Sequence, residues 1–258
     1  MDYLRRNILK NIVVITVLIF LLSFYSCSSD DSETLPPVLN TLLPISEIDL
    51  SSFLSEPSGI VFNPTSNSFF VVSDTISKIF EIDLNGNFIR SVTVDATDME
   101  GITLSNSNDS IYIVEESNNK VTTFLLNGIK INSFTVDVST NSVNGLEGIT
   151  FDDKNSLFVV NEKLPRFLVE LENNIQIRRI EITVVDDLSD VCYDFQLDCL
   201  WIISDESKKI LKVSKTGSVI SEWSIPFSKG EGITIVNNYL YVVRDSDSKM
   251  YVFNKPNN

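Results

Sequence analysis

The chain has 258 residues, of which 43% are hydrophobic and 21% charged, and this balance excludes an intrinsically disordered polypeptide. Its 20 lysines and arginines face 35 aspartates and glutamates, so the formal charge is −15 and nucleic acid is not expected as a partner. Histidine is absent, which excludes Ser-His-Asp and Cys-His catalysis and zinc sites that need imidazole, and leaves carboxylates, hydroxyls or a hard metal ion for any chemistry.

Residues 1–26 have the pattern of an export signal. A basic start is followed by an apolar run over residues 12–22 and then by small and aromatic residues. Phe24-Tyr25-Ser26-Cys27 resembles a bacterial lipobox, which predicts cleavage before Cys27 and acylation of that residue, with palmitate among the acyl chains. The alternative is an uncleaved anchor, although 11 apolar residues form a short membrane span.

Residues 27–40 predict a flexible linker, because they are acidic, polar and contain Pro36-Pro37. The acidic tract directly after Cys27 resembles the surface-export signals of some Gram-negative lipoproteins. We therefore expect an outer-membrane lipoprotein at the cell surface, attached to the membrane through the lipid on Cys27. A plain solvated spacer is the alternative for this tract.

The remainder of the chain contains a repeat. One series of short segments recurs every 41 to 47 residues: SGIVF (58–62), EGITL (100–104), EGITF (147–151), DVCYD (190–194) and EGITI (231–235). A second series follows each of them and ends in an acid: FFVVSD, IYIVEE, LFVVNE, LWIISD and LYVVRD. Both series are rich in β-branched and aromatic residues and too short for helices, so they predict β-strands.

A third predicted strand begins at a basic residue in every repeat. In the first four repeats it is followed by a turn and a fourth strand, with turns at Asn85-Gly86, Asn127-Gly128, Asn173-Asn174 and Thr216-Gly217. We expect two-residue type I′ turns there, in which both central residues have positive φ. Four antiparallel strands in each repeat of 40 to 45 residues predict a β-propeller blade.

The fifth repeat ends before a fourth strand. Ile45–Leu50 lies ahead of the first repeat and has the length and composition of the missing strand. We therefore predict an all-β fold over residues 41–258, a five-bladed β-propeller of four-stranded blades whose last blade is closed by an N-terminal strand. Cys192 and Cys199 lie on two arms of one hairpin and are expected to be buried free thiols.

Two series of acids are expected at one face, which we call the upper face: the end of the ring where the inner strands begin and the second strands end. The first series stands directly before the glycine of each inner strand, with Val191 in place of the glycine in the fourth repeat. It comprises Glu100, Glu147, Asp190 and Glu231, with Ser58 at the corresponding position of the first repeat. The second series, which ends the second strands, comprises Asp74, Glu116, Glu162, Asp205 and Asp245. Each of its members is followed four residues later by a base, so we expect salt bridges at the rim or an outer layer around an ion site.

The first series has no such bases. Glycines after three of its members allow the inner strands to approach the propeller axis, so the carboxylates are expected to converge and repel one another. A calcium ion, which takes oxygen ligands, would neutralise them, and Glu100, Glu147, Asp190 and Glu231 are the predicted metal ligands. The alternative is that each carboxylate accepts hydrogen bonds from backbone amides of a neighbouring blade.

These residues also carry a family resemblance. Glu56-Pro57-Ser58-Gly59-Ile60, Val71-Val72-Ser73-Asp74, Asp98-Met99-Glu100-Gly101-Ile102 and the later Glu-Gly-Ile segments resemble the SdiA-regulated (YjiK-like) family of exported bacterial proteins. The resemblance implies a five-bladed propeller with calcium at a central site and no established catalytic activity. Asp190-Val191 departs from the Glu-Gly pattern. A wider similarity connects the chain with propeller lactonases, which often use a catalytic histidine that this chain lacks.

We expect a monomeric, extracytoplasmic binding module whose upper loops, such as 137–146 and 183–190, take a glycan, peptide or protein ligand. The alternative is a metal-dependent hydrolase, a phosphodiesterase, lactonase or glycosidase, that uses the central carboxylates. A third interpretation makes the propeller a purely structural subunit of an outer-membrane complex.

Overall fold

A computed structural model describes residues 40–138 and 144–256 of the chain. The predictions for the export signal, for Cys27 and for the linker up to residue 39 lie outside the described residues, as does the middle of loop 137–146. The described residues include no helix that is long and apolar enough to cross a membrane.

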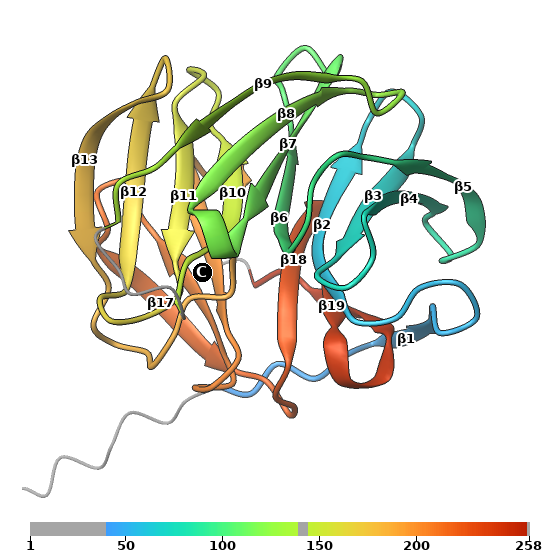
Figure 1. Cartoon of the computed structure of the whole chain (residues 1–258). Helices are drawn as coiled ribbons and strands as arrows, with labels where there is room; N and C mark the ends of the chain where they lie inside the picture. Colours follow the sequence, from blue (N-terminus) through green and yellow to red (C-terminus); the bar gives the residue numbers. More distant parts are fainter. Residues whose placement is uncertain (1–39, 139–143, 257–258) are drawn as a thin grey trace, which may run out of the picture. The chain divides into compact units, whose positions relative to one another are not determined.

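The described chain forms five four-stranded antiparallel sheets arranged as the blades of a propeller (Figure 1). Blade 1 has β2 (Pro57–Asn63), β3 (Ser68–Ser73), β4 (Lys78–Asp83) and β5 (Phe88–Thr93). Blade 2 has β6 (Met99–Leu104), β7 (Ser110–Glu115), β8 (Lys120–Leu125) and β9 (Lys130–Thr135). Blade 3 has β10 (Leu146–Phe151), β11 (Leu157–Asn161), β12 (Phe167–Glu172) and β13 (Ile175–Glu181). Blade 4 has β14 (Asp190–Asp194), β15 (Cys199–Ser204), β16 (Lys209–Val213) and β17 (Val219–Ser224).

Blade 5 is built from both ends of the described chain. It has β18 (Gly230–Val236), β19 (Tyr239–Arg244) and β20 (Lys249–Asn254), and its outer strand is β1 (Ser46–Asp49), which pairs with β20. The predicted five-bladed propeller and its closure by an N-terminal strand are confirmed. Before β1, the backbone at Leu42 donates a hydrogen bond to the Ser224 carbonyl at 2.8 Å, so the chain passes the outer strand of blade 4 first.

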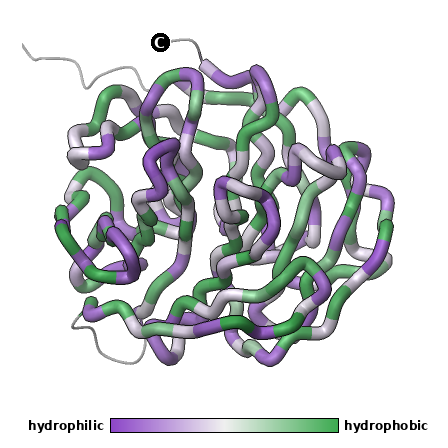
Figure 2. The backbone as a smooth tube through the Cα atoms, turned by 90° about the horizontal axis from the view of Figure 1, so that it is seen from above, coloured by the Kyte–Doolittle hydropathy of each residue, from purple (hydrophilic) through white to green (hydrophobic). Residues whose placement is uncertain are grey.

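The hydrophobic core lies between the blades. Five clusters of buried side chains fill the five interfaces, and each cluster combines residues of two adjacent blades. Figure 2 shows apolar and hydrophilic segments alternating along the backbone all around this ring. Cys192 and Cys199 are buried free thiols, as predicted. Because every blade needs two neighbours to cover its faces, the inner strands are held in a closed ring.

The hairpin turns correct one prediction. Asn173 and Asn174 both have positive φ, as a type I′ turn requires. At each of the other three turns only the glycine has positive φ among the described residues (Gly86, Gly128 and Gly217), and the residue before it does not. There the glycine amide donates back across the turn, from Gly86 to the Asp83 carbonyl at 3.0 Å, for example. These are three-residue turns in which one glycine takes the left-handed conformation, so the residue before it does not need to.

Candidate metal centre

A pocket of about 290 Å³ lies at the upper end of the inner strands. Its charged lining consists of one lysine, Lys229, and ten carboxylates: Glu56, Asp74, Glu100, Glu116, Glu147, Glu162, Asp187, Asp205, Glu231 and Asp245. Three of the four predicted metal ligands and all five members of the second acidic series are in this set. The upper face therefore brings together most of the predicted acidic residues.

β-Bulges set the direction of the inner-strand carboxylates. In blades 2, 3 and 5 the pairing of the inner strand with its neighbour is irregular at the Glu-Gly step that contains Glu100, Glu147 or Glu231. A bulge adds one residue to a strand and re-aims a side chain, here toward the pocket. Blade 4 has the sequence Asp190-Val191 and a regular register at these positions.

The glycines of the bulges allow adjacent inner strands to lie very close together. A Cβ atom on Gly101 would lie 2.3 Å from the carbonyl oxygen of Glu147, and one on Gly59 would lie 2.4 Å from that of Glu100. Each glycine therefore faces the backbone of the next blade, where no side chain fits. This contact brings the acids of successive blades near the axis.

Asp190, the fourth predicted ligand, lies apart from the other three. Only 2% of the residue is exposed, and it does not line the pocket of the described structure. Its Oδ1 accepts a hydrogen bond from the amide of Val191 and its Oδ2 one from the amide of Ile233, both at 2.7 Å. Without the bulge, its carboxylate stays between the blades and links blade 4 to blade 5, as the alternative interpretation of the series supposed.

The carboxylates that could share one ion lie on the side of blades 2 and 3. Oxygen atoms of Asp98, Glu100 and Glu116 lie within 4.8 Å of one another, and so do oxygen atoms of Glu116, Glu147 and Glu162. Glu116 belongs to both triads, at the start of the short 3-10 helix η1 (Glu116–Asn118). Its Oε1 also accepts a hydrogen bond from the Gly145 amide at 3.0 Å, which orients the carboxylate.

On the opposite side of the pocket, protein groups partly compensate the negative charge. The ammonium of Lys229 lies 3.2 Å from Asp205 and 3.5 Å from Glu231. Asp187 accepts hydrogen bonds from the backbone amides of Asp205 and Glu206, each at 3.0 Å. Glu231 therefore has a cationic neighbour that Glu100 and Glu147 do not have among the described residues.

The second acidic series does not form the salt bridges that the sequence predicted. Among the described residues, Lys120 contacts Glu115 at 2.9 Å instead of Glu116, and Lys249 contacts Glu47 at 2.9 Å instead of Asp245. The reason is the register: Lys120 lies opposite Glu115 in the strand pair, whereas Glu116 already belongs to the turn. Among the described residues, Glu162 pairs instead with Lys163 at 2.7 Å and Asp205 with Lys229 at 3.2 Å. All five acids line the pocket, and Glu116 is central to it.

Sequence reasoning also missed Asp98, which was not among the predicted ligands. It lies two residues before Glu100 with a left-handed φ of 55°, and its Oδ2 accepts a hydrogen bond from the Ser117 amide at 2.9 Å. Aspartate tolerates this conformation better than most residues do. An aspartate two residues before the Glu-Gly step, in Asp98-Met99-Glu100-Gly101, was the available signal.

The electrostatics of the pocket disfavour full ionisation. Burial and then the charges of Asp74 and Glu116 hold the pKa of Glu100 well above its usual range. Burial and the charge of Glu100 do the same to the pKa of Glu147. Burial followed by the charge of Asp205 raises the pKa of Glu231 to about 7, although Lys229 opposes the shift. A cation in the pocket would reverse these effects.

The fold and the acidic channel mouth define a five-bladed β-propeller with a candidate oxygen-ligand cation site. The model of the SdiA-regulated family matches residues 40–258, which is most of the chain. The chain belongs to this family. No curated protein matches the sequence.

Solved structures of other propellers are similar in fold. Virginiamycin B lyase from Staphylococcus aureus aligns with a TM-score of 0.54 and 12% identity over 81% of this chain and 98% of that one. A catalytically inactive variant of that lyase with quinupristin aligns with a TM-score of 0.51 and 18% identity over 77% of this chain. The alignment covers 66% of the variant, which is just under two thirds of the length of that protein. A luciferin-regenerating enzyme gives 0.52 and 10% identity over 81% and 94%. At these identities the likeness concerns the fold alone.

Proposed function

We propose that the chain is a calcium-binding β-propeller lipoprotein that acts outside the cytoplasm as an interaction module. The observation that carries this proposal is the placement of Glu116, whose carboxylate lies within 4.8 Å of the acids of two triads. Two oxygens that bind one Ca²⁺ at about 2.3 to 2.6 Å are at most about 5 Å apart, so this spacing suits a shared ion. The proposed ligands are those of the two triads: Asp98, Glu100 and Glu116 on one side, and Glu116, Glu147 and Glu162 on the other, with Glu116 common to both.

The chemistry of the pocket favours calcium over softer metals. Its charged lining is carboxylate apart from Lys229, and the chain contains no histidine. Zinc and copper sites usually need imidazole or thiolate ligands, whereas Ca²⁺ takes carboxylates, carbonyls and water. We propose that the ion fixes the upper rim, on which loop 183–190 and the loop around residue 145 present a surface for a glycan, peptide or protein.

The proposed attachment to the membrane rests on the sequence before the propeller. A basic start, an apolar run and a cysteine at position 27 support a lipid anchor on Cys27, and the acidic tract after it supports display at the cell surface. Together with the ion site, this gives a tethered module whose upper face recognises another molecule.

Calcium should raise the melting temperature of the purified protein. At a calcium concentration of about 100 times Kd, binding adds about 2.7 kcal/mol, which corresponds to roughly 5 to 10 °C in a domain of this size. Glu116→Gln removes a charge shared by both triads and should abolish most of this rise. Thermal unfolding followed by circular dichroism, in calcium and in chelator, measures the effect.

The matched control for that experiment is Glu47→Gln, which removes an acid outside the pocket whose side chain is 53% exposed. This variant should keep the full calcium effect. A melting curve of the unaltered protein that is the same in calcium and in chelator contradicts the proposal.

The calcium effect should also depend on pH. Because burial raises the pKa of Glu100 and Glu147, the metal-free protein is destabilised as pH rises above about 4.3, the value of an unfolded glutamate. Calcium binds the ionised carboxylates and must displace their protons. The gain in melting temperature should therefore be larger at pH 8 than at pH 5.5, and a gain that is equal at both pH values contradicts this account.

A metal-dependent hydrolase is the second candidate. The observation in its favour is Glu231, which lines the pocket and whose pKa burial raises to about 7, so that it could act as a general acid. One similar lyase is a variant inactivated by replacing a histidine, and this chain has none, so that chemistry is not transferred. Turnover of chromogenic lactones or phosphodiesters that Glu231→Gln abolishes would favour this candidate over the binding module.

A further inference from the structure

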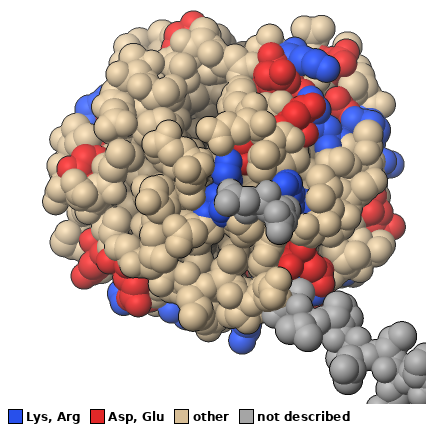
Figure 3. All heavy atoms as spheres, turned by 180° about the vertical axis from the view of Figure 1, so that it is seen from behind, with Lys and Arg blue, Asp and Glu red and all other residues tan. Residues whose placement is uncertain are grey.

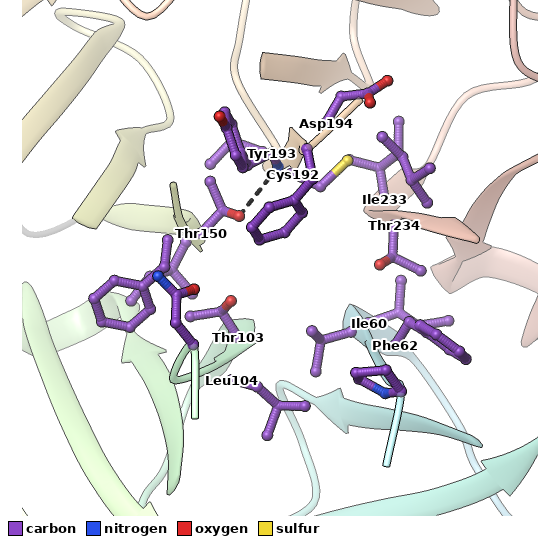
Figure 4. A pocket seen from close by; sticks show the side chains of 18 of the residues that line it. Ile60, Phe62, Thr103, Leu104, Thr150, Cys192, Tyr193, Asp194, Ile233 and Thr234 are labelled. Atoms are coloured by element: carbon purple, nitrogen blue, oxygen red, sulfur yellow. Dashed lines mark hydrogen bonds between the residues drawn. The ribbon is translucent and has the colours of Figure 1, made fainter. Parts of the chain in front are cut away.

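A second and larger cavity, of about 470 Å³, lies at the other end of the inner strands. Figure 4 shows part of its lining, which consists of the later residues of the same five strands and of the turns that follow them. The acidic pocket is lined instead by residues at the start of these strands. Sites for small organic molecules typically occupy about 300 to 1,000 Å³. The volume therefore lies within the range of such sites.

The wall of this cavity is mainly apolar. Ile60, Ile102, Ile149 and Ile233 occupy one equivalent position in four blades, and all four contribute to the lining. At the mouth, Phe195 lines the cavity, although 66% of it is exposed. A molecule that enters would lose contact with water and gain contact with aliphatic and aromatic groups.

Two hydroxyl groups interrupt the apolar wall. Thr103 and Thr234 are each 5% exposed, and neither side chain has a hydrogen-bond partner among the described residues. At the equivalent position of blade 3, the Thr150 hydroxyl accepts a hydrogen bond from the Tyr193 amide at 3.1 Å. Figure 4 shows the hydroxyls of Thr103 and Thr234 directed into the space between the strands. Neither hydroxyl oxygen is fully buried, so both open into the cavity, where a ligand can supply the partner.

The charged groups in the wall neutralise one another. The Lys255 ammonium lies 2.8 Å from Asp194, and their side chains are 4% and 1% exposed. The third charged residue of the lining, Asp153, accepts a hydrogen bond from the Tyr193 hydroxyl at 3.1 Å and lies 3.7 Å from Lys215. No unpaired charge is thus offered by the described lining to an ionic ligand, and an uncharged one is favoured. Figure 3, a space-filling view from behind, shows charges of both signs interspersed with uncharged surface.

We propose that this lower cavity binds an uncharged small molecule with an apolar body and a hydrogen-bonding group that Thr103 and Thr234 recognise. The body fills the space between the isoleucines, and the polar group reaches the two hydroxyls. The site is independent of the proposed calcium centre, because the two pockets have no lining residue in common.

The test uses N-phenyl-1-naphthylamine, an uncharged aromatic amine whose fluorescence increases in apolar surroundings. Titrated with the full chain, the dye should show saturable binding at one site. Thr103→Phe places a ring in the cavity and should weaken binding at least about tenfold. Thr103→Val and Thr234→Val keep the volume and remove one hydroxyl each, and should each weaken binding about threefold to tenfold.

Thr123→Val is the matched control. Thr123 is also 5% exposed but lines neither pocket, so this variant should bind the dye as the unaltered protein does. Dye that binds to exposed surface contributes the same fluorescence in all variants, so this contribution cancels when their affinities are compared. Binding that does not saturate, or that is equal in Thr103→Phe and the unaltered protein, overturns the proposal. If Thr103→Phe does not fold, equal affinities of Thr103→Val, Thr234→Val and Thr123→Val overturn it.

Discussion

Replacing Gly101 by alanine should lower the free energy of unfolding by about 3 kcal/mol and the melting temperature by about 10 °C. A Cβ atom at this position would lie 2.3 Å from the carbonyl oxygen of Glu147, and the atom it meets belongs to the backbone of the next blade. A backbone atom cannot move aside as a side chain can, so β6 and β10 would have to separate. Urea denaturation followed by circular dichroism measures the loss.

Gly217→Ala provides the control with the same substitution. Gly217 has a φ of 81°, and a Cβ atom there would meet the side chain of Ile180, which can rotate away. Its expected cost is the left-handed conformation alone, about 1 to 2 kcal/mol. If Gly101→Ala lowers the free energy of unfolding by no more than Gly217→Ala does, the close approach of the inner strands does not constrain the ring.

Replacing Lys255 by methionine should destabilise the protein by about 3 to 5 kcal/mol. Lys255 and Asp194 form an almost fully buried ion pair at 2.8 Å, and the variant leaves the Asp194 carboxylate without its cation. Lys249→Met is the matched control, because the Lys249–Glu47 pair is 34% and 53% exposed and contributes about 1 kcal/mol or less. Equal losses of unfolding free energy in the two variants would contradict a stabilising role of the buried pair.

The pH dependence identifies the charge responsible. Burial works to raise the pKa of Asp194, but the hydrogen bonds from Lys255 and Trp201 outweigh it and lower that pKa. A lowered pKa stabilises the folded state above the unfolded value of about 3.9, and this stabilisation is lost as pH falls. The difference between the unaltered protein and Lys255→Met should therefore shrink below about pH 4. Adding Asp194→Asn to Lys255→Met should restore part of the lost stability at pH 7.

The repeat was sufficient to predict the blades, because each one is encoded by a short run of adjacent residues. The pairing of β1 with β20 could also be predicted, since one strand was missing at the end and one was left over at the start. The turn types were less predictable. Asn85-Gly86 has the composition of a type I′ turn, but the hairpin forms a three-residue turn in which only Gly86 has positive φ.

The candidate site was predicted in its location and only partly in its residues. Alignment of the repeats placed Asp190 with Glu100, Glu147 and Glu231, but Val191 replaces the glycine, and without the bulge the carboxylate turns to the backbone of blade 5. The spacing of four residues suggested that Glu116 pairs with Lys120, whereas the strand register gives that lysine to Glu115. A difference of one residue in register decided which acids face the axis.

The lower cavity was visible in the sequence only as a repeated threonine. Thr103, Thr150 and Thr234 all follow the isoleucine of the Glu-Gly-Ile segment. In a strand this position could have served pairing between blades, and at Thr150 it does. Whether the other two hydroxyls had partners depended on the positions of amides in neighbouring blades, which no pattern along the chain specifies.

The joining of β1 to β20 has a consequence for how the protein is made. Lys249 and Glu47, which contact each other across this pair, are 202 positions apart. A chain that is made with its N-terminus first therefore presents β1 as a free edge until β20 (Lys249–Asn254) has emerged. Such distant pairing is slow to form, and unpaired edges attract other chains. Before β20 is available to pair with β1, this unpaired edge exposes the chain to aggregation.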